Sequence, residues 1–418
     1  MDKQTSTASG PAELLRLKSQ YLIPCVYHFY KDPPQIVAGE GAYLIDHTGR
    51  RYLDFYSGVT VMSAGHCNPA IIEPAIDQIR RLQHTTSIYL TEPVLRLAEM
   101  LAQLAPGDLS RSFFCASGSE AIEGALLTAS LHTGRGGIVA TTDSLHGRTR
   151  WAMNATGLEM WRTDPFPLPG VHRVPFGDAT ALRRHLETAH SLPAAFIAEP
   201  IEGNGGIVIP PPDYWPAVRK LCDHFGVLLV LDEVQTGINR TGRWFACEHW
   251  GVVPDILVTS KALGNGFPIS AFTTNPAVAA SYTRPGASTH GGNPVSAAAA
   301  LATLRFHQAN ELGQRAQRIG ELLKNEIATT VAKCAHLRPP HGMGLMIGLF
   351  VHDGAGNPDA ALCDSLLERL KDNGVFAGKT GPGRSTLTFM PPLTVTEDEV
   401  KEFADAFRKS VEAVCQHP

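Results

Sequence analysis

Two short, almost wholly apolar runs between residues 227 and 270 constrain the fold of this chain more than any other feature. The first run, VLLVL, ends at Asp232, and the second run, ILVTS, ends at Lys261. Apolar runs of this length, bounded by Gly and Pro, are typical of strands buried on both faces of a parallel sheet. Because ligands of open α/β sheets bind at the carboxyl ends of the strands, Asp232 and Lys261 are predicted to face one bound molecule.

An anion and an amine at one sheet edge are the pair that pyridoxal 5′-phosphate (PLP) requires. A carboxylate keeps the pyridine nitrogen protonated, so that the ring withdraws electrons, and an amine holds the cofactor aldehyde as a Schiff base. A strand-end salt bridge between the same two residues is the structural alternative, and spacing alone favours it.

Two motifs in this stretch, DEVQTG-x-x-RTG and PDI-x-x-x-SK-x-LGNG-x-P, resemble the signature of the class III, or omega-type, PLP-dependent aminotransferases. The resemblance extends from about Tyr21 to Val411. It implies an α/β chain of PLP-dependent transferase fold type I. In this fold, a large domain contains a mostly parallel sheet of the seven-stranded type, and a small α+β domain accompanies it. We expect residues 1–60 to belong to the small domain, residues 61–304 to form the large PLP-binding domain, and residues 305–418 to form the C-terminal small domain.

The resemblance also implies roles for individual residues. Lys261 would carry the Schiff base and move the proton, Asp232 would pair with the ring nitrogen, and Gln235 would hydrogen-bond the ring hydroxyl oxygen. Leu145 stands where the family usually stacks an aromatic ring on the cofactor, so the aromatic contribution of about 0.5–1.5 kcal/mol is lost. The remaining cofactor contacts near these residues are expected from His146 and Glu199.

A small-residue turn before an Ala-rich helix is the candidate phosphate site. Ser117 and Glu120 stand at the spacing of a capping box, and a helix N-terminus suits a phosphate. An ordinary helix cap explains the same turn. Its likeness to the family's phosphate site makes Ser117, Gly118 and Ser119 candidates, and the same resemblance makes Thr289 a phosphate ligand for the neighbouring subunit of a homodimer.

The expected substrate pocket shows two departures from family members that use 2-oxoglutarate. Those members carry a glutamate at the position of Asn204, and this glutamate pairs with an arginine at the position of Thr388. We therefore expect pyruvate or glyoxylate as the amino acceptor. Arg384 is the candidate anchor for its carboxylate, with a solvated loop arginine as the alternative, and the pocket lining is expected from Ser57, Val59 and Thr60.

Within the class, the motifs YLDFYSG, HTTS and GLMIG are most like those of alanine–glyoxylate and omega-amino acid:pyruvate aminotransferases. The expected reaction moves an amino group from an amine or an omega- or alpha-amino acid to a small keto acid. Three alternatives are a PLP-dependent phospho-lyase, an amino-acid epimerase, and a binding protein on an inactive aminotransferase fold. The intact Asp232, Gln235 and Lys261 argue against the last.

Composition narrows the class of protein further. A net charge of −4 without a basic block gives no electrostatic surface for nucleic acid. No apolar run reaches membrane-spanning length, and residues 1–10 read as a polar tail without a signal peptide's apolar core, so a cytoplasmic enzyme is expected.

Eight cysteines without CxxC spacing predict reduced thiols. His66 and Cys67 lack partners at metal spacing, which predicts a structural histidine and no metal.

Local patterns predict several elements elsewhere in the chain. Turn residues His47–Arg50 lie between two alternating runs and predict a hairpin. Helical periodicity predicts a helix over Glu92–Leu104, and an apolar run predicts a strand over Thr386–Phe389. Thr396 and Glu399 stand at capping-box spacing, which predicts the start of the last helix.

Overall fold

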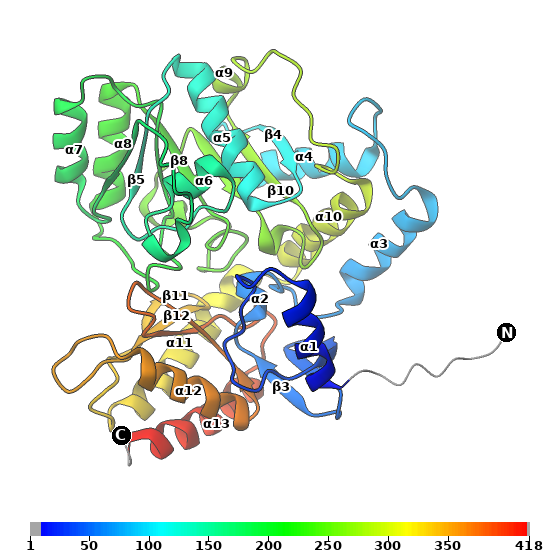
Figure 1. The fold of residues 1–418 in the computed structure, drawn as a ribbon. Coiled ribbons are helices and arrows are strands. Elements are labelled where there is room, and N and C mark those ends of the chain that lie inside the picture. The colour runs from blue at the N-terminus through cyan, green and yellow to red at the C-terminus, as the bar shows by residue number, and fades with distance from the viewer. Residues whose placement is uncertain (1–9, 416–418) are drawn as a thin grey trace.

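A seven-stranded sheet lies at the centre of the larger part of the molecule (Figure 1). The computed structural model describes residues 10–415, so the predicted polar tail lies almost wholly outside the described residues. The strand order is β4-β10-β9-β8-β7-β5-β6, and β10 runs antiparallel to both of its neighbours while the other pairs are parallel. The strands are β4 (Arg111–Cys115), β5 (Ile138–Thr141), β6 (Val171–Val174), β7 (Ala195–Ala198), β8 (Leu228–Asp232), β9 (Ile256–Thr259) and β10 (Ser270–Thr274).

The middle strands are buried along their whole length, as their sequences predict. Every residue of β7, β8 and β9 is buried, because helices cover both faces of the sheet. One apolar core lies between the sheet and helices α4, α7, α8 and α10, and a second lies between the sheet and helices α5 and α6. The helices of this part are α3 (Pro69–Arg81), α4 (Glu92–Leu104), α5 (Gly118–Thr133), α6 (Arg150–Ala155), α7 (Ala179–Thr188), α8 (Tyr214–Phe225), α9 (Pro276–Ala279) and α10 (Pro294–Ala309).

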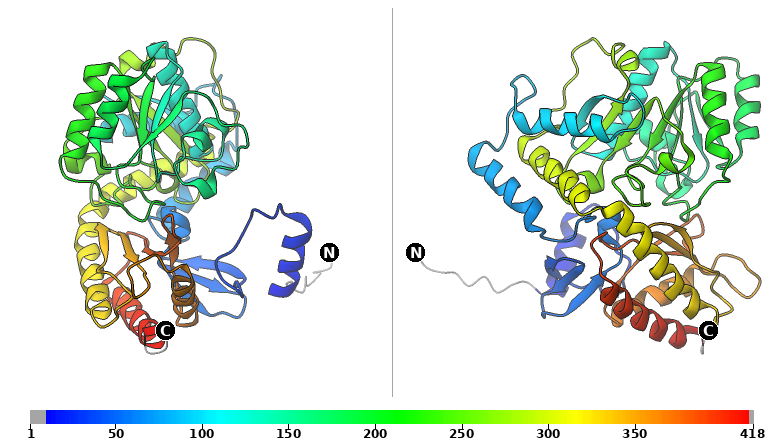
Figure 2. Two further views of the ribbon diagram at one scale, coloured as in Figure 1. Left: turned by 60° about the vertical axis from the view of Figure 1, so that its left-hand side comes forward. Right: turned by 180° about the vertical axis from the view of Figure 1, so that it is seen from behind.

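The smaller part combines two four-stranded sheets with three helices, and it lies below the central sheet in Figures 1 and 2. One sheet has the order β11-β12-β15-β14, and the other has the order β1-β2-β3-β13. The elements are β1 (Ile36–Glu40), β2 (Tyr43–Asp46), β3 (Arg51–Asp54), β11 (His341–Met343), β12 (Met346–Phe350), β13 (Val375–Phe376), β14 (Gly378–Thr380), β15 (Thr386–Phe389), α11 (Leu312–Val331), α12 (Ala360–Asp372) and α13 (Glu397–Cys415).

Two distant parts of the chain share one of these sheets. Strand β3 pairs in parallel with β13, so the N-terminal hairpin joins the C-terminal region. Helix α1 (Pro11–Tyr21), by contrast, buries none of its residues, and Figure 2 shows it standing out from the body of the molecule. The predicted limit between residues 304 and 305 lies within helix α10, and the predicted domain limits stay a prediction.

Several local predictions are confirmed. The hairpin β2–β3 surrounds the turn at residues 47–50, and helix α4 and strand β15 have the predicted bounds. Thr396 and Glu399 form the predicted capping box: the Glu399 N–H donates to Thr396 Oγ1 at 3.2 Å, and the Thr396 N–H donates to Glu399 Oε2 at 2.7 Å.

The prediction that the cysteines are all reduced thiols is wrong for one pair. Cys334, just beyond helix α11, forms a disulfide with Cys415 at the end of helix α13, across a sequence separation of 81 residues. Six cysteines are free. Spacing in the sequence carried no signal for this bond, because only the packing of α11 against α13 brings the two thiols together.

Removal of this disulfide is expected to destabilise the small domain. In the chain-entropy account, a loop of this length loses about 2–5 kcal/mol of stabilisation when Cys415→Ser opens it. Urea unfolding of Cys415→Ser and of Cys67→Ser, a matched change at an exposed free cysteine, measures the difference. Alkylation of all eight cysteines in denatured, unreduced protein would contradict the bond itself.

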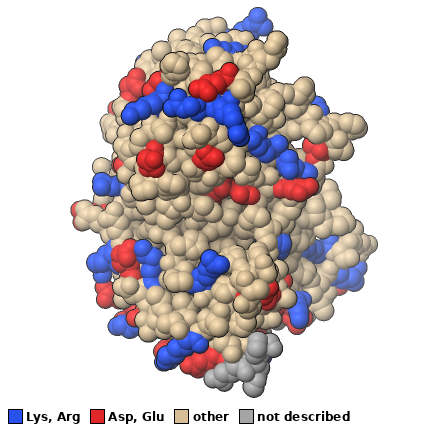
Figure 3. Space-filling view, turned by 90° about the vertical axis from the view of Figure 1, so that its left-hand side faces the viewer, with Lys and Arg blue, Asp and Glu red and all other residues tan. Residues whose placement is uncertain are grey.

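Within residues 10–415, none of the helices has both the length and the apolar character needed to cross a bilayer. No cluster of three or more potential His, Cys, Asp or Glu metal ligands occurs in the same part of the chain. His66 instead bonds Asp54, with 2.7 Å between Nε2 and Oδ2. On the face seen in Figure 3, basic and acidic side chains lie near one another.

Candidate active site

Strand β8 ends on the buried carboxylate of Asp232, which is 3 % exposed. His146 Nδ1 lies 2.8 Å from Asp232 Oδ2, and the Val234 N–H donates to Asp232 Oδ1 at 3.1 Å. A proton on His146 Nδ1 makes this ring a donor to the carboxylate, which orients Asp232. His146 Nε2 is buried without a hydrogen-bond partner in the described chain.

Lys261 follows the neighbouring strand β9 and begins the short 3₁₀ turn Lys261–Leu263. Its backbone lies in the left-handed region with φ of 47°, which is unusual for a residue with a side chain and common at functional sites. Burial lowers the pKa of the Lys261 amine to about 8, and the carboxylates of Glu199 and Asp232 oppose this shift. A fraction of the amine is therefore uncharged near neutral pH, as a nucleophilic lysine requires.

Both residues line an inner cavity of about 230 Å³ at the carboxyl edge of the sheet. Eight of the ten cofactor residues expected from the sequence are brought together there: Gly118, Ser119, Leu145, His146, Glu199, Asp232, Gln235 and Lys261. The alternative of a salt bridge between Asp232 and Lys261 is not what the structure shows, because the ion-pair contact of Asp232 is with His146.

The N-terminus of helix α5 opens into this cavity. Ser117 is its N-cap: the Glu120 N–H donates to Ser117 Oγ at 3.3 Å, and the Ala116 N–H donates to the Glu120 carboxylate at 2.9 Å. The Ser117 half of the predicted capping box is therefore present, but the Glu120 carboxylate bonds the N–H of Ala116 and not that of Ser117. Ser117 itself does not line the cavity. The N–H groups of Gly118 and Ser119 have no acceptor within the described chain, so they remain free for an anion.

Glu199 joins two loops around the cavity. Its carboxylate accepts hydrogen bonds from the Leu145 N–H at 2.9 Å and the Gly203 N–H at 3.0 Å. Burial, with the charge of Asp232 nearby, raises the pKa of Glu199 to about 7. A Cβ at Gly203 would lie 2.7 Å from Gln235 Oε1, so a larger residue here would displace the Gln235 amide.

An outer cavity of about 310 Å³ adjoins the inner one, and Leu145, Asn204 and Lys261 line both. Of the residues expected to bind substrate, Val59 and Arg384 line the outer cavity. Thr60 does not, because its side chain is buried away from both cavities. Ser57 is also outside, since its hydroxyl donates to the Met390 carbonyl at 2.7 Å.

Several lining residues of the outer cavity were missed in the sequence. They are Tyr27, Phe29, Tyr56, Leu158, Met160, Trp161 and Lys379. They come from the N-terminal loop (residues 22–35, between helix α1 and strand β1), from the segment after strand β3, from the 3₁₀ turn Glu159–Trp161 with the residue before it, and from strand β14. These segments have no common motif. The local signals were the aromatic content of residues 27–30 and, for Tyr56, its place in the YLDFYSG motif.

Of the two positions that depart from the 2-oxoglutarate pattern, Asn204 lines the outer cavity, whereas Thr388 is buried behind its wall. The Asn204 carbonyl accepts hydrogen bonds from the Gly381 N–H at 2.9 Å and from Thr380 Oγ1 at 2.5 Å. Thr388 is buried, and its Oγ1 has no partner in the described chain. A Cβ at Gly378 would lie 2.5 Å from this oxygen and 2.1 Å from the Tyr56 ring, so the Tyr56 ring packs close to Thr388.

Thr289 lies outside both cavities, exposed on the loop that precedes helix α10.

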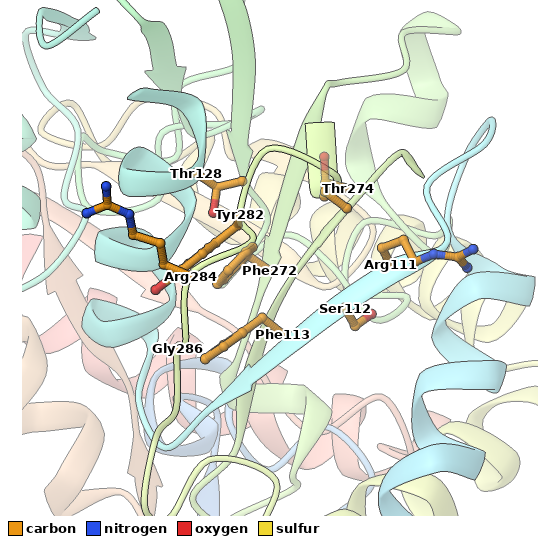
Figure 4. A pocket seen from close by; sticks show the side chains of 10 residues that line it. Arg111, Ser112, Phe113, Thr128, Phe272, Thr274, Tyr282, Arg284 and Gly286 are labelled. Carbon is orange, nitrogen blue, oxygen red and sulfur yellow. The ribbon is translucent and has the colours of Figure 1, made fainter. Parts of the chain in front are cut away.

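A separate cavity of about 240 Å³ lies beside edge strand β4 and contains none of the predicted site residues. Figure 4 shows the rings of Phe113, Phe272 and Tyr282 at its centre, with Arg111 and Arg284 on opposite sides.

The donor set of the inner cavity fits PLP. It offers a carboxylate for a ring nitrogen, an amine of lowered pKa for an aldehyde, and free N–H groups at a helix start for a phosphate. Together with the sheet order, this arrangement defines the chain as an enzyme of the PLP-dependent aminotransferase type. Residues 30–411 match the class III aminotransferase family, and the chain belongs to that family. It is a PLP-dependent aminotransferase.

Similar proteins and solved structures support this assignment. The chain is 36% identical to an alanine–glyoxylate aminotransferase 2 homolog of Arabidopsis thaliana, over 96% of this chain and 88% of that protein. It is 39% identical to a putrescine aminotransferase of Pectobacterium atrosepticum, over 88% and 80%. Among solved structures, the ornithine aminotransferase of Toxoplasma gondii superposes with a TM-score of 0.90 at 29% identity, covering 99% of this chain and 97% of that one.

Proposed function

We propose that this aminotransferase moves an amino group from an amine or an omega- or alpha-amino acid to pyruvate or glyoxylate. The observation that carries the proposal is that Asn204 lines the outer cavity and that the buried Thr388 behind the Tyr56 ring brings no cation to it. A dicarboxylate acceptor needs a second free cationic anchor besides Arg384. Thr388 supplies none, and the Lys379 amine is already paired with Asp364. An unpaired carboxylate buried at this wall would cost several kcal/mol.

When bound, PLP supplies an aldehyde that bonds amines and a protonated ring that withdraws electrons. In the proposed assignment, Lys261 is the amine that bonds the aldehyde and then carries a proton to and from the substrate carbon. Asp232 holds the ring nitrogen protonated, and His146 orients Asp232. Gln235 contacts the ring hydroxyl oxygen, and Gly118 and Ser119 bind the phosphate through their N–H groups.

Arg384 is the proposed anchor for the single carboxylate of the acceptor. It lines the outer cavity, and its guanidinium carbon lies 5.7 Å from the centre of the Tyr27 ring. Its loop contains Gly381 and Gly383, and Arg384 has a φ of 51°. This short loop lets the side chain reach a carboxylate near Lys261 or withdraw against Tyr27.

The acceptor claim predicts that pyruvate or glyoxylate is used at least tenfold more efficiently than 2-oxoglutarate. Tenfold corresponds to about 1.4 kcal/mol, which is less than the cost of one unpaired carboxylate. Comparing kcat/KM for the three keto acids tests it, and equal or better use of 2-oxoglutarate would exclude it. Arg384→Ala should raise the KM for pyruvate, and an unchanged affinity would remove Arg384 from the site.

A spectral half-reaction tests the transfer itself. An amino donor should remove the visible absorbance of the bound cofactor until a keto acid restores it. A phospho-lyase or epimerase substrate would leave the absorbance restored without a keto acid.

We further propose that the enzyme acts as a homodimer in the cytoplasm. Ile88, Tyr89 and Leu90, between helices α3 and α4, are 83%, 66% and 89% exposed in the single chain. Apolar side chains this exposed are typical of an interface. The exposed Thr289 is then available to the partner's phosphate site. Sedimentation should give twice the chain mass of 45.0 kDa, and a monomer would contradict the proposal.

A further inference from the structure

The outer cavity has an aromatic wall that the N-terminal loop helps to build. Tyr27 lies 6.3 Å from Trp161 and 5.8 Å from Phe29, and Phe29 lies 5.8 Å from Tyr56, measured between ring centres. Leu145, Leu158 and Met160 add apolar surface to the same wall. This wall favours a ligand with an apolar or aromatic body, because such a body removes ring surface from water.

The charges of the outer cavity all have one sign. Lys379 and Arg384 line it beside Lys261, whose amine is the proposed bond to the cofactor, and none of the described lining residues is acidic. Lys379 forms an ion pair with Asp364, but the Asp364 side chain is 49% exposed and does not line the cavity. The carboxylates of Glu199 and Asp232 belong to the inner cavity, where the cofactor is proposed to bind.

Arg384 in particular has no competing anion. Within residues 10–415, no carboxylate lies at ion-pair distance from it, and its contact is the face of Tyr27. An incoming anion therefore replaces a cation–π contact with a charge-assisted hydrogen bond, whereas an incoming ammonium meets a like charge.

We propose that the amino donor has an apolar, preferably aromatic, body and an anionic group remote from its amine, and that diamines are rejected. This rests on the proposed function, because it places the donor amine beside Lys261. It also separates this chain from relatives named for putrescine or ornithine, whose substrates carry a second amine.

Four donors separate the contributions of ring and charge in the spectral half-reaction. They are 3-amino-3-phenylpropanoate (ring and anion), 1-phenylethylamine (ring only), 4-aminobutyrate (anion only) and putrescine (a second cation). The first should give the highest bleaching rate per concentration, and putrescine should be at least tenfold slower than 4-aminobutyrate. Putrescine within threefold of 4-aminobutyrate, or faster, would overturn the inference.

Variants assign the effect to residues. Arg384→Gln should lower the rate ratio of 3-amino-3-phenylpropanoate to 1-phenylethylamine at least tenfold. Tyr27→Ala should lower the ratio of 3-amino-3-phenylpropanoate to 4-aminobutyrate, and Tyr27→Phe should restore it. Arg408→Gln, at an exposed arginine of helix α13, is the matched control and should change neither ratio. Unchanged ratios in both cavity variants would contradict the inference.

A binding measurement tests the same inference without turnover. Calorimetry with 3-phenylpropanoate, which has the ring and the anion but no amine, should show binding that Arg384→Gln weakens at least tenfold. Equal binding by the variant would overturn the role of the cation. If putrescine bleaches the cofactor well, only this inference fails. If no donor bleaches it and borohydride labels no lysine, the proposed function fails as well.

Discussion

Lys261→Ala is expected to abolish turnover while leaving a protein that still binds PLP. The phosphate contacts at helix α5 and the carboxylate of Asp232 are untouched by this change, so only the covalent bond and the proton carrier are lost. Loss of a positioned acid–base group alone costs about 10²–10⁴ in rate, and loss of the nucleophile adds to it. The measurement is kcat for transamination, with cofactor content determined after gel filtration.

The matched control for this change is Lys401→Ala. Lys401 lies on helix α13 with its side chain 69% exposed, in an ion pair with Asp398, and its loss should leave kcat unchanged. In wild-type protein, borohydride should attach the cofactor irreversibly to one lysine. Peptide mapping that finds the label on a lysine other than Lys261 would show that the site is assigned to the wrong amine.

Asp232→Asn is expected to lower kcat by about 10²–10³ while PLP remains bound. The magnitude is that of removing one preorganised electrostatic group from a buried site. Asn keeps the shape of Asp232 and can still accept a hydrogen bond from His146 or Val234. It has no negative charge, however, and so it no longer favours a protonated ring nitrogen.

Two comparisons make this result specific. Asp223→Asn, at a 63% exposed carboxylate on helix α8, removes the same charge away from the cavity and should leave kcat unchanged. His146→Gln should have a smaller effect than Asp232→Asn, because His146 acts through the carboxylate. A turnover near normal in Asp232→Asn would mean that the pyridine nitrogen lies elsewhere.

The sequence alone determined the parts of the protein whose cause is local. Continuous apolar runs at β8 and β9 predict buried strands, and their last residues reach the same sheet edge because parallel strands end together. The helix cap at Ser117 and the capping box at Thr396 were predicted because the partners stand three residues apart. The resemblance of the motifs to a known family predicted the fold and the cofactor. Spacing alone could not distinguish a cofactor site at Asp232 and Lys261 from a simple salt bridge.

Only the tertiary structure decided which side chains share a cavity. The contact of His146 with Asp232 joins residues 86 positions apart, and the aromatic wall joins the N-terminal loop to Trp161 and to the Arg384 loop. Thr60 was expected in the pocket, but its side chain is buried away from both cavities. The Cys334–Cys415 disulfide likewise joins residues that only the tertiary structure brings together. These features depend on how separate elements pack, and packing depends on contacts between residues that no local pattern relates.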